Sequence, residues 1–405
     1  MHAQSQETAS ADMVGRLFRR SIGIFFMGGF VTALVGLLVP RLTLIDRLDY
    51  TRGALVQFAF HSSYLVFALP ITALLVRTGY MRAIAAGLGV MTIACLGLCI
   101  AATIGSFPLL LLALLGLSTG ITFLQIAANV VQPLVAADGR GAARLTLLQG
   151  FNSVGTVLAP LIGASFLLQA NPLGRWSMGL PFLACAVALA MLGLVFWRAR
   201  GLLAAHPAPR RLPLADFGRV LRERRLAWGG LAMFGYVGAE VTIGSLLANY
   251  LARPDILGTD PATAGRLVSL YWGGAMLGRF AGAVGLARIA PARLLAIMAS
   301  GAVLLVAGAM HTHGVAGAAA LIAVGLCNAI MYPTVFALAL PEDRGLAPYA
   351  SMMLCMAVVG GAAVPLATGA LADRVGLAAA LVLPLLCYLG IAAFAGLVAL
   401  PAAKR

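Results

Sequence analysis

The sequence predicts an all-α integral membrane protein with twelve transmembrane helices in two six-helix, pseudo-symmetric halves. Of its 405 residues, 61% are hydrophobic and only 10% are charged, which excludes a soluble protein with an ordinary polar surface. Apolar runs long enough to cross a bilayer recur along the chain, and they lack the short alternating pattern of membrane β-barrels. Features of the first half also return in the second half at nearly constant spacing, which indicates an internal repeat.

The apolar runs follow one another in chain order with short polar loops between most of them. They lie roughly at 21–41, 54–76, 83–104, 108–133, 145–168, 178–197, 228–251, 264–287, 293–310, 315–340, 348–370 and 377–400. The polar stretches outside them divide the chain into four parts. We expect a disordered cytoplasmic tail over 1–15, a first half over 16–197, a basic cytoplasmic linker over 198–226 and a second half over 227–405.

Arginine positions predict the orientation in the membrane. Most of the 28 basic residues fall before the first span, in alternate loops and in the linker, so these parts are expected on the cytoplasmic side. Both termini are then cytoplasmic in a multi-pass protein of a bacterial-type inner (plasma) membrane. Because the arginines are dispersed at span ends, the formal charge of +15 indicates anionic lipid as the neighbour and no nucleic acid.

Three matches in chain order support the internal repeat. GFVTAL begins at Gly29 and GYVGAE at Gly235, an offset of 206 residues. The arginine pair Arg77 and Arg82 returns as Arg288 and Arg293, an offset of 211. GTVLAP begins at Gly155 and GGAAVP at Gly360, an offset of 205. Each match is weak, but together they predict two parallel six-helix repeats with a solute site between them near the midplane.

Glu240 is the one acidic residue of thirteen that falls in the middle of a predicted span. A carboxylic acid at this depth costs roughly 2.5 to 3.5 kcal/mol on insertion scales, so such residues usually face a water-filled path or a partner. Glu240 is therefore our candidate for proton coupling. The alternative is a permanently protonated acid that bonds a neighbouring carbonyl group and has no transport role.

Polar side chains gather on one face of several other predicted helices. Spacings of three or four residues place them on a common face in each helix. The candidate solute-binding residues are Gln57, Gln125, Asn129, Gln149, Asn152, Tyr236, Asn328 and Tyr332. Amides both donate and accept hydrogen bonds, which suits a polyhydroxylated or amide-rich solute. The alternative is that these groups only join helices to one another.

Other polar residues have less specific interpretations. His61 is the one histidine within a predicted span and is a second candidate for proton coupling, although a neutral hydrogen-bonding role is as open to it. Arg279 lies nearer the inner face and is interpreted as a gating brace. Arg77, Arg82 and Arg144 are assigned to the same gating or structural class.

Several kinds of chemistry are not supported by the sequence. The one lysine is Lys404, so a Walker A lysine is missing and the chain cannot by itself be an ATP-driven pump. Catalytic motifs with supporting context are missing too, so we expect no enzyme activity and no cofactor. His311 and His313 alone do not make a metal site. An ion gradient, of protons or sodium, or simple facilitation would drive any transport.

At its polar spans the sequence resembles the fucose:proton symporter family of the major facilitator superfamily, and most closely the glucose/galactose transporter branch. The matching stretches are FLQIAAN from Phe123, RLTLLQGFNSVGT from Arg144, YVGAEVTIGS from Tyr236, YWGGAMLGRFAG from Tyr271, GLCNAIMYPTVFALAL from Gly325 and AVVGGAAVPLATGALAD from Ala357. The resemblance implies a twelve-helix fold and ion-coupled uptake of monosaccharides. By position, it also implies that Gln125, Asn129, Gln149, Asn152 and Glu240 are central polar residues.

The first helix departs from the family pattern. In FFMGGFVTALVGLLVP, Gly28 stands where the family has a tryptophan suited to stacking on a sugar, and Val35 and Gly36 replace an asparagine and an aspartate. Val130 also stands where the family has a proline. A pocket widened in this way could hold a solute larger than a hexose.

The sequence thus predicts a secondary transporter of a small polar organic solute, working by alternating access. Uptake of a glucose- or galactose-like sugar is preferred. The alternative is export of a larger polar metabolite such as a siderophore or a drug, and a membrane receptor without transport is a third possibility. We expect the chain to act as a monomer in the lipid bilayer.

Overall fold

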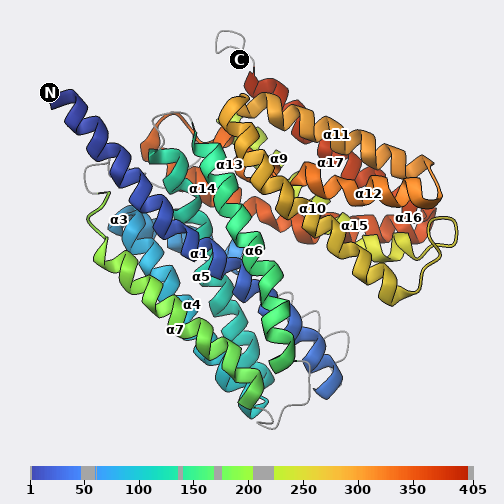
Figure 1. The fold of residues 1–405 in the computed structure, drawn as a ribbon, viewed down its shortest axis with the longest axis horizontal. Coiled ribbons are helices and arrows are strands. Elements are labelled where there is room, and N and C mark those ends of the chain that lie inside the picture. Colours follow the sequence, from blue (N-terminus) through green and yellow to red (C-terminus); the bar gives the residue numbers. More distant parts are fainter. Residues whose placement is uncertain are drawn as a thin grey trace. The chain divides into compact units, whose positions relative to one another are not determined.

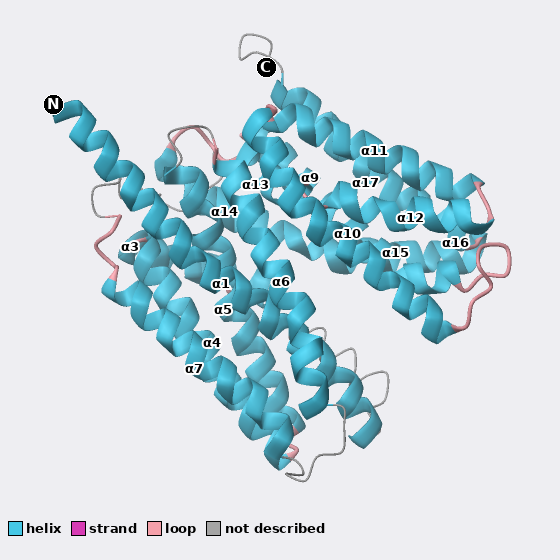
Figure 2. Cartoon of the chain, in the orientation of Figure 1, coloured by secondary structure: helices cyan, strands magenta, loops and turns pink. Residues whose placement is uncertain are grey.

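A computed structural model describes residues 2–46, 60, 62–135, 140–167, 176–203 and 223–399. Within this part of the chain the regular structure is helical and there is no β-strand (Figure 2). Ten stretches are long and apolar enough to cross a membrane by length and composition. These observations confirm the all-helical membrane fold class.

Two of the twelve predicted spans, 54–76 and 264–287, are not among these ten stretches. The span at 264–287 corresponds to α10 (Pro261–Arg288), whose 28 residues give a helix of about 42 Å, enough to cross the hydrocarbon core. The span at 54–76 falls partly on residues outside the described ranges. Its later part contains α3 (Ala68–Thr78).

The chain forms two compact units. The first unit consists of Met1–Ala136, Phe151–Arg211 and Asp343–Cys355. Within it α4 packs between α5 and α7, and α1 packs against α5 and α7 (Figure 1). Its helices are α1 (His2–Asp46), α3, α4 (Tyr80–Ile104), α5 (Phe107–Val135), most of α6 (Gly141–Leu167), α7 (Trp176–Arg198), the 3₁₀ turn η1 (Arg344–Leu346) and most of α14 (Ala347–Met356).

The second unit consists of Ala137–Gly150, Leu212–Glu342 and Met356–Arg405. Helix α9 is central to it and packs against α10, α13, α15 and α17. Besides α10 its helices are α9 (Arg224–Leu251), α11 (Pro291–His311), α12 (Gly314–Asn328), α13 (Met331–Ala339), the 3₁₀ turn η2 (Ala357–Val359), α15 (Gly360–Val375), α16 (Leu377–Ala380) and α17 (Val382–Ala399).

Each unit therefore contains one segment from the opposite half of the sequence. Ala137–Gly150, from the first half, belongs to the second unit, and Asp343–Cys355, from the second half, belongs to the first unit. We call these two stretches the exchanged segments. Helix α6 is divided by the exchange, because its residues after Gly150 belong to the first unit.

Glycines bring two helices into close contact at equivalent places in the two units. A Cβ atom on Gly155 of α6 would overlap the carbonyl oxygen of Phe26 on α1. A Cβ atom on Gly360 of α15 would likewise overlap the carbonyl oxygen of Phe234 on α9. Small residues permit such close backbone packing of membrane helices. Gly155 and Gly360 are the pair that the sequence repeat aligned, so each half uses its matched glycine for the same kind of contact.

Two helix ends differ from the sequence prediction. Helix α1 begins at His2, whereas we expected a disordered tail over 1–15. The stretch from His2 to Val14 contains neither glycine nor proline, so the backbone has no residue that breaks a helix there. The predicted span at 315–340 is broken between Asn328 and Met331. Pro333 lacks the N–H group that a continuous helix would use to bond the Ala329 carbonyl.

Candidate functional site

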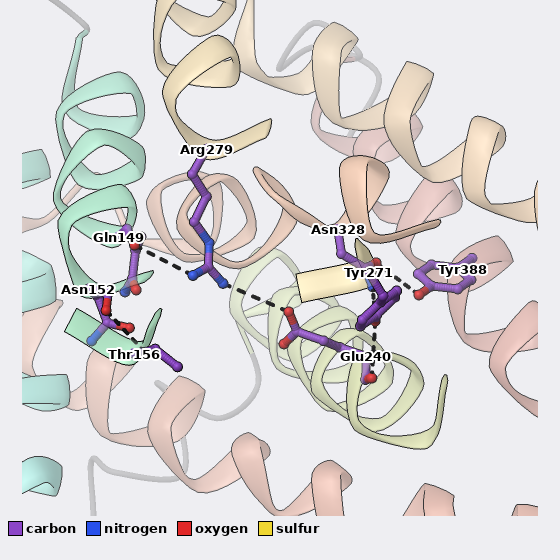
Figure 3. Close-up of polar contacts among 8 residues, drawn as sticks. All are labelled: Gln149, Asn152, Thr156, Glu240, Tyr271, Arg279, Asn328 and Tyr388. Atoms are coloured by element: carbon purple, nitrogen blue, oxygen red, sulfur yellow. Dashed lines mark hydrogen bonds and ion pairs between the residues drawn. The ribbon is translucent and has the colours of Figure 1, made fainter. Parts of the chain in front are cut away.

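Glu240 lies well inside α9, where the neighbouring turns carry only uncharged side chains. Its side chain is 13% exposed, and its Oε1 atom accepts no hydrogen bond within the described part of the chain. The nearest cationic group is the guanidinium of Arg279 on α10, with 3.9 Å between Nη2 and Oε1 (Figure 3). At this separation the two side chains form a loose ion pair in a weakly polar environment.

Arg279 has a second acceptor on another element of the second unit. Its Nη1 donates to the carbonyl oxygen of Gln149 at 3.5 Å (Figure 3). Gln149 is the next-to-last residue of the exchanged segment Ala137–Gly150. From the sequence we interpreted Arg279 as a gating brace near the inner face and did not pair it with Glu240. A lone arginine in one apolar helix and a lone glutamate in another were the signals that could have suggested the pair.

Aromatic side chains lie close to Glu240. Tyr236 is one helical turn before it on α9, its side chain is 1% exposed, and its hydroxyl is buried. Its ring centroid is 6.2 Å from that of Tyr332, which in turn stacks on Phe336 at 6.2 Å. The structure thus brings Tyr236 and Tyr332, two predicted solute-binding residues, together beside the acid.

Asn328 is fully buried and is held by two tyrosines. Its Nδ2 donates to the hydroxyl oxygen of Tyr271 at 2.7 Å, and the Tyr388 hydroxyl donates to its Oδ1 at 2.8 Å. The Tyr271 hydroxyl donates to the backbone carbonyl of Glu240 at 3.1 Å (Figure 3). This chain of bonds links α9, α10, α12 and α17. Asn328 is a predicted solute-binding residue, and in this structure its amide is bonded to these two tyrosine hydroxyls.

Tyr271 and Tyr388 were missed by the sequence analysis. Both are fully buried, and each lies in a mostly apolar predicted span. A buried tyrosine usually requires a partner for its hydroxyl, and that requirement was the available signal. The sequence alone could not have identified Asn328 as the partner.

The polar residues of the first unit form a separate group. Asn129 is 2% exposed and donates to Oε1 of Gln125 at 2.6 Å, one turn earlier on α5. Asn152 on α6 donates to the carbonyl oxygen of Phe25 on α1 at 3.0 Å. Gly28 lies beside it, because a Cβ atom there would be 3.6 Å from Nδ2 of Asn152. The glycine that replaces the family's tryptophan is therefore next to a predicted solute-binding amide.

The structure gives less information about the remaining predicted residues. Gln57 and His61 lie outside the described residues. Arg77 and Arg82 are exposed, and Arg144 is partly buried on α6. No group of three or more His, Cys, Asp or Glu residues that could hold a metal ion occurs among the residues searched, which are the described ones.

Comparison with known proteins identifies the family. The family model described as Major Facilitator Superfamily matches residues 26–340. The chain is 37% identical over 397 residues to a glucose/galactose transporter of Brucella abortus biovar 1 (strain 9-941), covering 97% of this chain and 96% of that protein. It is 28% identical over 405 residues to the L-fucose-proton symporter of Escherichia coli (strain K12), covering 92% and 90%.

A solved structure agrees with these matches. The crystal structure of the E. coli fucose:proton symporter superposes with a TM-score of 0.83 at 25% identity, covering 95% of this chain and 98% of that chain. The resemblance seen in the sequence is thus confirmed over nearly the whole chain. The chain belongs to the major facilitator superfamily, within the group that contains the glucose/galactose transporters and the fucose:proton symporters.

Proposed function

We propose that the protein is a proton-coupled symporter that carries a hexose of the glucose/galactose type into the cell. The single observation that supports it most is the Glu240–Arg279 pair beside Tyr236 and Tyr332, in a chain 37% identical to a glucose/galactose transporter. Related proteins named as transporters of glucose, galactose and fucose support a sugar over a larger metabolite.

The side chains at the site suit a neutral, hydroxyl-rich solute. Amide groups donate and accept, as sugar hydroxyls require, and aromatic faces pack on the C–H face of a pyranose ring. Tyr332 presents such a face in the second unit. Gly28 of the first helix offers no such ring.

Glu240 is the proposed proton site, and His61 stays a second candidate. A proton moving down its gradient can neutralise the Glu240 carboxylate, and its release inside the cell then resets the carrier. The orientation with both termini in the cytoplasm of a bacterial-type inner membrane rests on the arginine distribution. We propose a monomer in contact with lipid, with the proton rather than sodium as the coupling ion and with no catalytic step.

The test is uptake of labelled hexose into proteoliposomes that contain the purified protein. An inward proton gradient should drive glucose or galactose above equilibrium, and a protonophore should abolish the accumulation. An inward sodium gradient at equal pH is the matched control and should give equilibration only. Accumulation driven by sodium would refute proton coupling, and no hexose flux in either condition would refute the sugar assignment.

A further inference from the structure

The two exchanged segments differ at one pair of matched hydroxyl groups. In the first unit, Ser351 of Asp343–Cys355 donates to the carbonyl oxygen of Ile126 on α5 at 2.8 Å and reaches that of Gln125 at 3.4 Å. Ser351 corresponds to Thr146 of Ala137–Gly150, by the same offset of 205 residues that relates Gly155 to Gly360. Ser351 thus joins this segment to the backbone of α5 by neutral hydrogen bonds.

The equivalent hydroxyl in the second unit makes no such bond. Thr146 is fully buried, and its Oγ1 atom has no hydrogen-bond partner in the described structure. Around it the segment packs through an apolar cluster of Ala142, Ala143, Leu286, Leu294, Ala329 and Ile330. A buried hydroxyl without a partner costs about 1–3 kcal/mol, so Thr146 weakens the attachment of this segment.

One polar contact of Ala137–Gly150 beyond this cluster is to Arg279. The guanidinium lies between two acceptors, with Nη1 at 3.5 Å from the Gln149 carbonyl and Nη2 at 3.9 Å from the Glu240 carboxylate (Figure 3). Both distances exceed the usual 2.7–3.2 Å of an N–H···O bond, so the group occupies a position between the two optima. A movement of about 1 Å toward either acceptor would shorten one contact and lengthen the other.

We propose that Arg279 is a positioning residue that makes the attachment of Ala137–Gly150 depend on the proton at Glu240. When the carboxylate is ionised, it attracts the guanidinium away from the Gln149 carbonyl and loosens the segment. When the carboxylate is protonated, the attraction is lost, and Arg279 fastens the segment through Gln149. The proposal rests on the proposed function, since it uses Glu240 as the proton site.

The other described ionisable groups near Glu240 are three tyrosines and one arginine. Those that interact electrostatically with Glu240 are Tyr236 on its own helix, Tyr271 and Arg279 on α10, and Tyr388 on α17. Among the described residues around the pair, Glu240 is the one carboxylic acid.

Hydrogen–deuterium exchange of the full-length protein in lipid nanodiscs tests the proposal without any sugar. Backbone exchange in 141–150 is compared at pH 6 and pH 9 among wild type, Glu240→Gln, Arg279→Gln and the double variant, each against wild type at the same pH. At pH 9 the segment 141–150 should exchange about tenfold more slowly in Glu240→Gln than in wild type. At pH 6 it should exchange about tenfold faster in Arg279→Gln than in wild type. A tenfold change corresponds to about 1.4 kcal/mol, which is the size expected for one hydrogen bond. The double variant should match Arg279→Gln alone.

Internal references and matched variants keep the outcome interpretable. Exchange in 345–355, the other segment, should not change in any variant, and Arg288→Gln on the exposed end of α10 should behave as wild type. If Arg279→Gln does not fold, Arg279→Lys takes its place in the test. Lysine keeps the positive charge, so this variant should retain the pH response.

The proposal is overturned if Arg279→Gln leaves 141–150 unchanged at pH 6, or if Glu240→Gln still alters it in the Arg279→Gln background. Hexose uptake measured on the same preparations separates the two hypotheses. If the wild type carries no hexose but shows the expected exchange pattern, the sugar assignment alone is refuted. If it carries hexose but does not show that pattern, the positioning role of Arg279 alone is refuted.

Discussion

The carboxylate of Glu240 and the guanidinium of Arg279 are each the lone charge in their stretch of helix, and the fold brings them to 3.9 Å. Breaking one side of such a buried pair leaves the other charge uncompensated, which costs about 3–5 kcal/mol. Substitutions at Glu240 should therefore keep its size and polarity, so that a loss of function can be attributed to the proton and not to unfolding.

Glu240→Gln should abolish accumulation of sugar against its gradient while exchange of internal for external sugar continues. Glutamine has the shape of a protonated glutamic acid but cannot release a proton, so the loaded carrier still reorients and the empty carrier loses its coupling. Proteoliposome uptake and counterflow measure the two activities. Glu342→Gln, at an exposed acid, is the control. Unchanged accumulation in Glu240→Gln would contradict the coupling role.

Asp255 provides a pH dependence at a residue outside the spans. Hydrogen bonds from Arg253, at 2.9 and 2.7 Å, hold the pKa of the Asp255 carboxyl below its usual value, and His313 adds a contact at 3.3 Å. A carboxyl whose folded pKa is lowered stabilises the fold above its unfolded pKa, and this contribution disappears as pH falls through the folded pKa.

We therefore expect Asp255→Asn to lower the unfolding temperature at pH 7 and to match wild type once the pH lies below the lowered pKa of Asp255, where both side chains are uncharged. Thermal unfolding across this pH range, followed by the accessibility of a buried thiol, measures the difference. Asp260→Asn in the same loop is the comparison. A deficit that persists at the lowest pH would mean that charge is not the cause.

Individual residue types at the site could be predicted, but their pairings could not. Glu240 is recognisable from sequence because a carboxylate in an apolar span is costly whatever surrounds it. Arg279 is recognisable for the same reason, yet nothing in the sequence indicates which face of α10 meets α9. Asn328 was assigned to a solute because an amide can bond a sugar or another side chain equally well, and only the structure shows that two tyrosine hydroxyls are bonded to it.

At the scale of helices, α9 is held from several sides by contacts that depend on single positions. Gly360 lets α15 approach the backbone of α9, and the Tyr271–Asn328–Tyr388 bonds join α9 to α10, α12 and α17. Glu240 is carried by this helix, so the position of the acid depends on both arrangements.

Gly360→Leu should destabilise the second unit strongly, because its side chain would overlap backbone atoms of Phe234 that cannot move independently of α9. Overpacking of this kind typically costs about 1–3 kcal/mol or more. Gly369→Leu on the same helix is the control, since a Cβ atom there meets nothing within 4 Å. Thermal stability in detergent distinguishes them, and equal stability of the two variants would mean that α15 does not need the glycine.

Asn328→Leu should lower the free energy of unfolding by about 1–3 kcal/mol, because the Tyr388 hydroxyl loses its acceptor in a buried place. Tyr388→Phe removes only one bond of the same chain and should cost less. Denaturant unfolding of both variants gives the comparison. If Asn328→Leu keeps full stability but loses sugar binding, Asn328 contacts the solute after all.

Helix positions were predicted closely, whereas helix irregularities were not. The predicted span 228–251 corresponds to α9 and 83–104 to α4, because long apolar runs can hardly form anything else in lipid. The break between α12 and α13 depends on how neighbouring helices satisfy the groups that Pro333 frees, which hydropathy does not report. The helical start of α1 differs from the expected tail because polar composition does not by itself prevent a helix.

On the scale of the whole molecule, the repeat in the sequence is matched by the glycine contacts of the two units. The exchange of segments between the units could not be predicted, because α6 is one continuous apolar helix whose two parts belong to different units. Hydropathy gives the length of a helix, but which neighbours each part of it contacts is decided by side-chain shape.

The predicted orientation of the molecule leads to opposite labelling of two exposed positions. Cysteine in place of His313, which is 72% exposed, should react with a membrane-impermeant maleimide in intact cells. Cysteine in place of the exposed Arg77 should react only after permeabilisation. Wild type is the blank, since its six cysteines are buried or partly buried. Reversed labelling would contradict the cytoplasmic assignment of the arginine-rich loops.

Helix α1 has 45 residues, of which Met13–Val35 is the stretch suited to the membrane. Its first turns therefore extend about 16 Å before the span begins. A chain of 41.7 kDa with most of its mass inside a micelle gives electron-microscope images little to align on. A folded helical domain fused to α1, so that the helix continues without a flexible linker, solves this problem. The added domain gives the particle images a feature outside the micelle to align on, which helps to determine the sugar-bound structure.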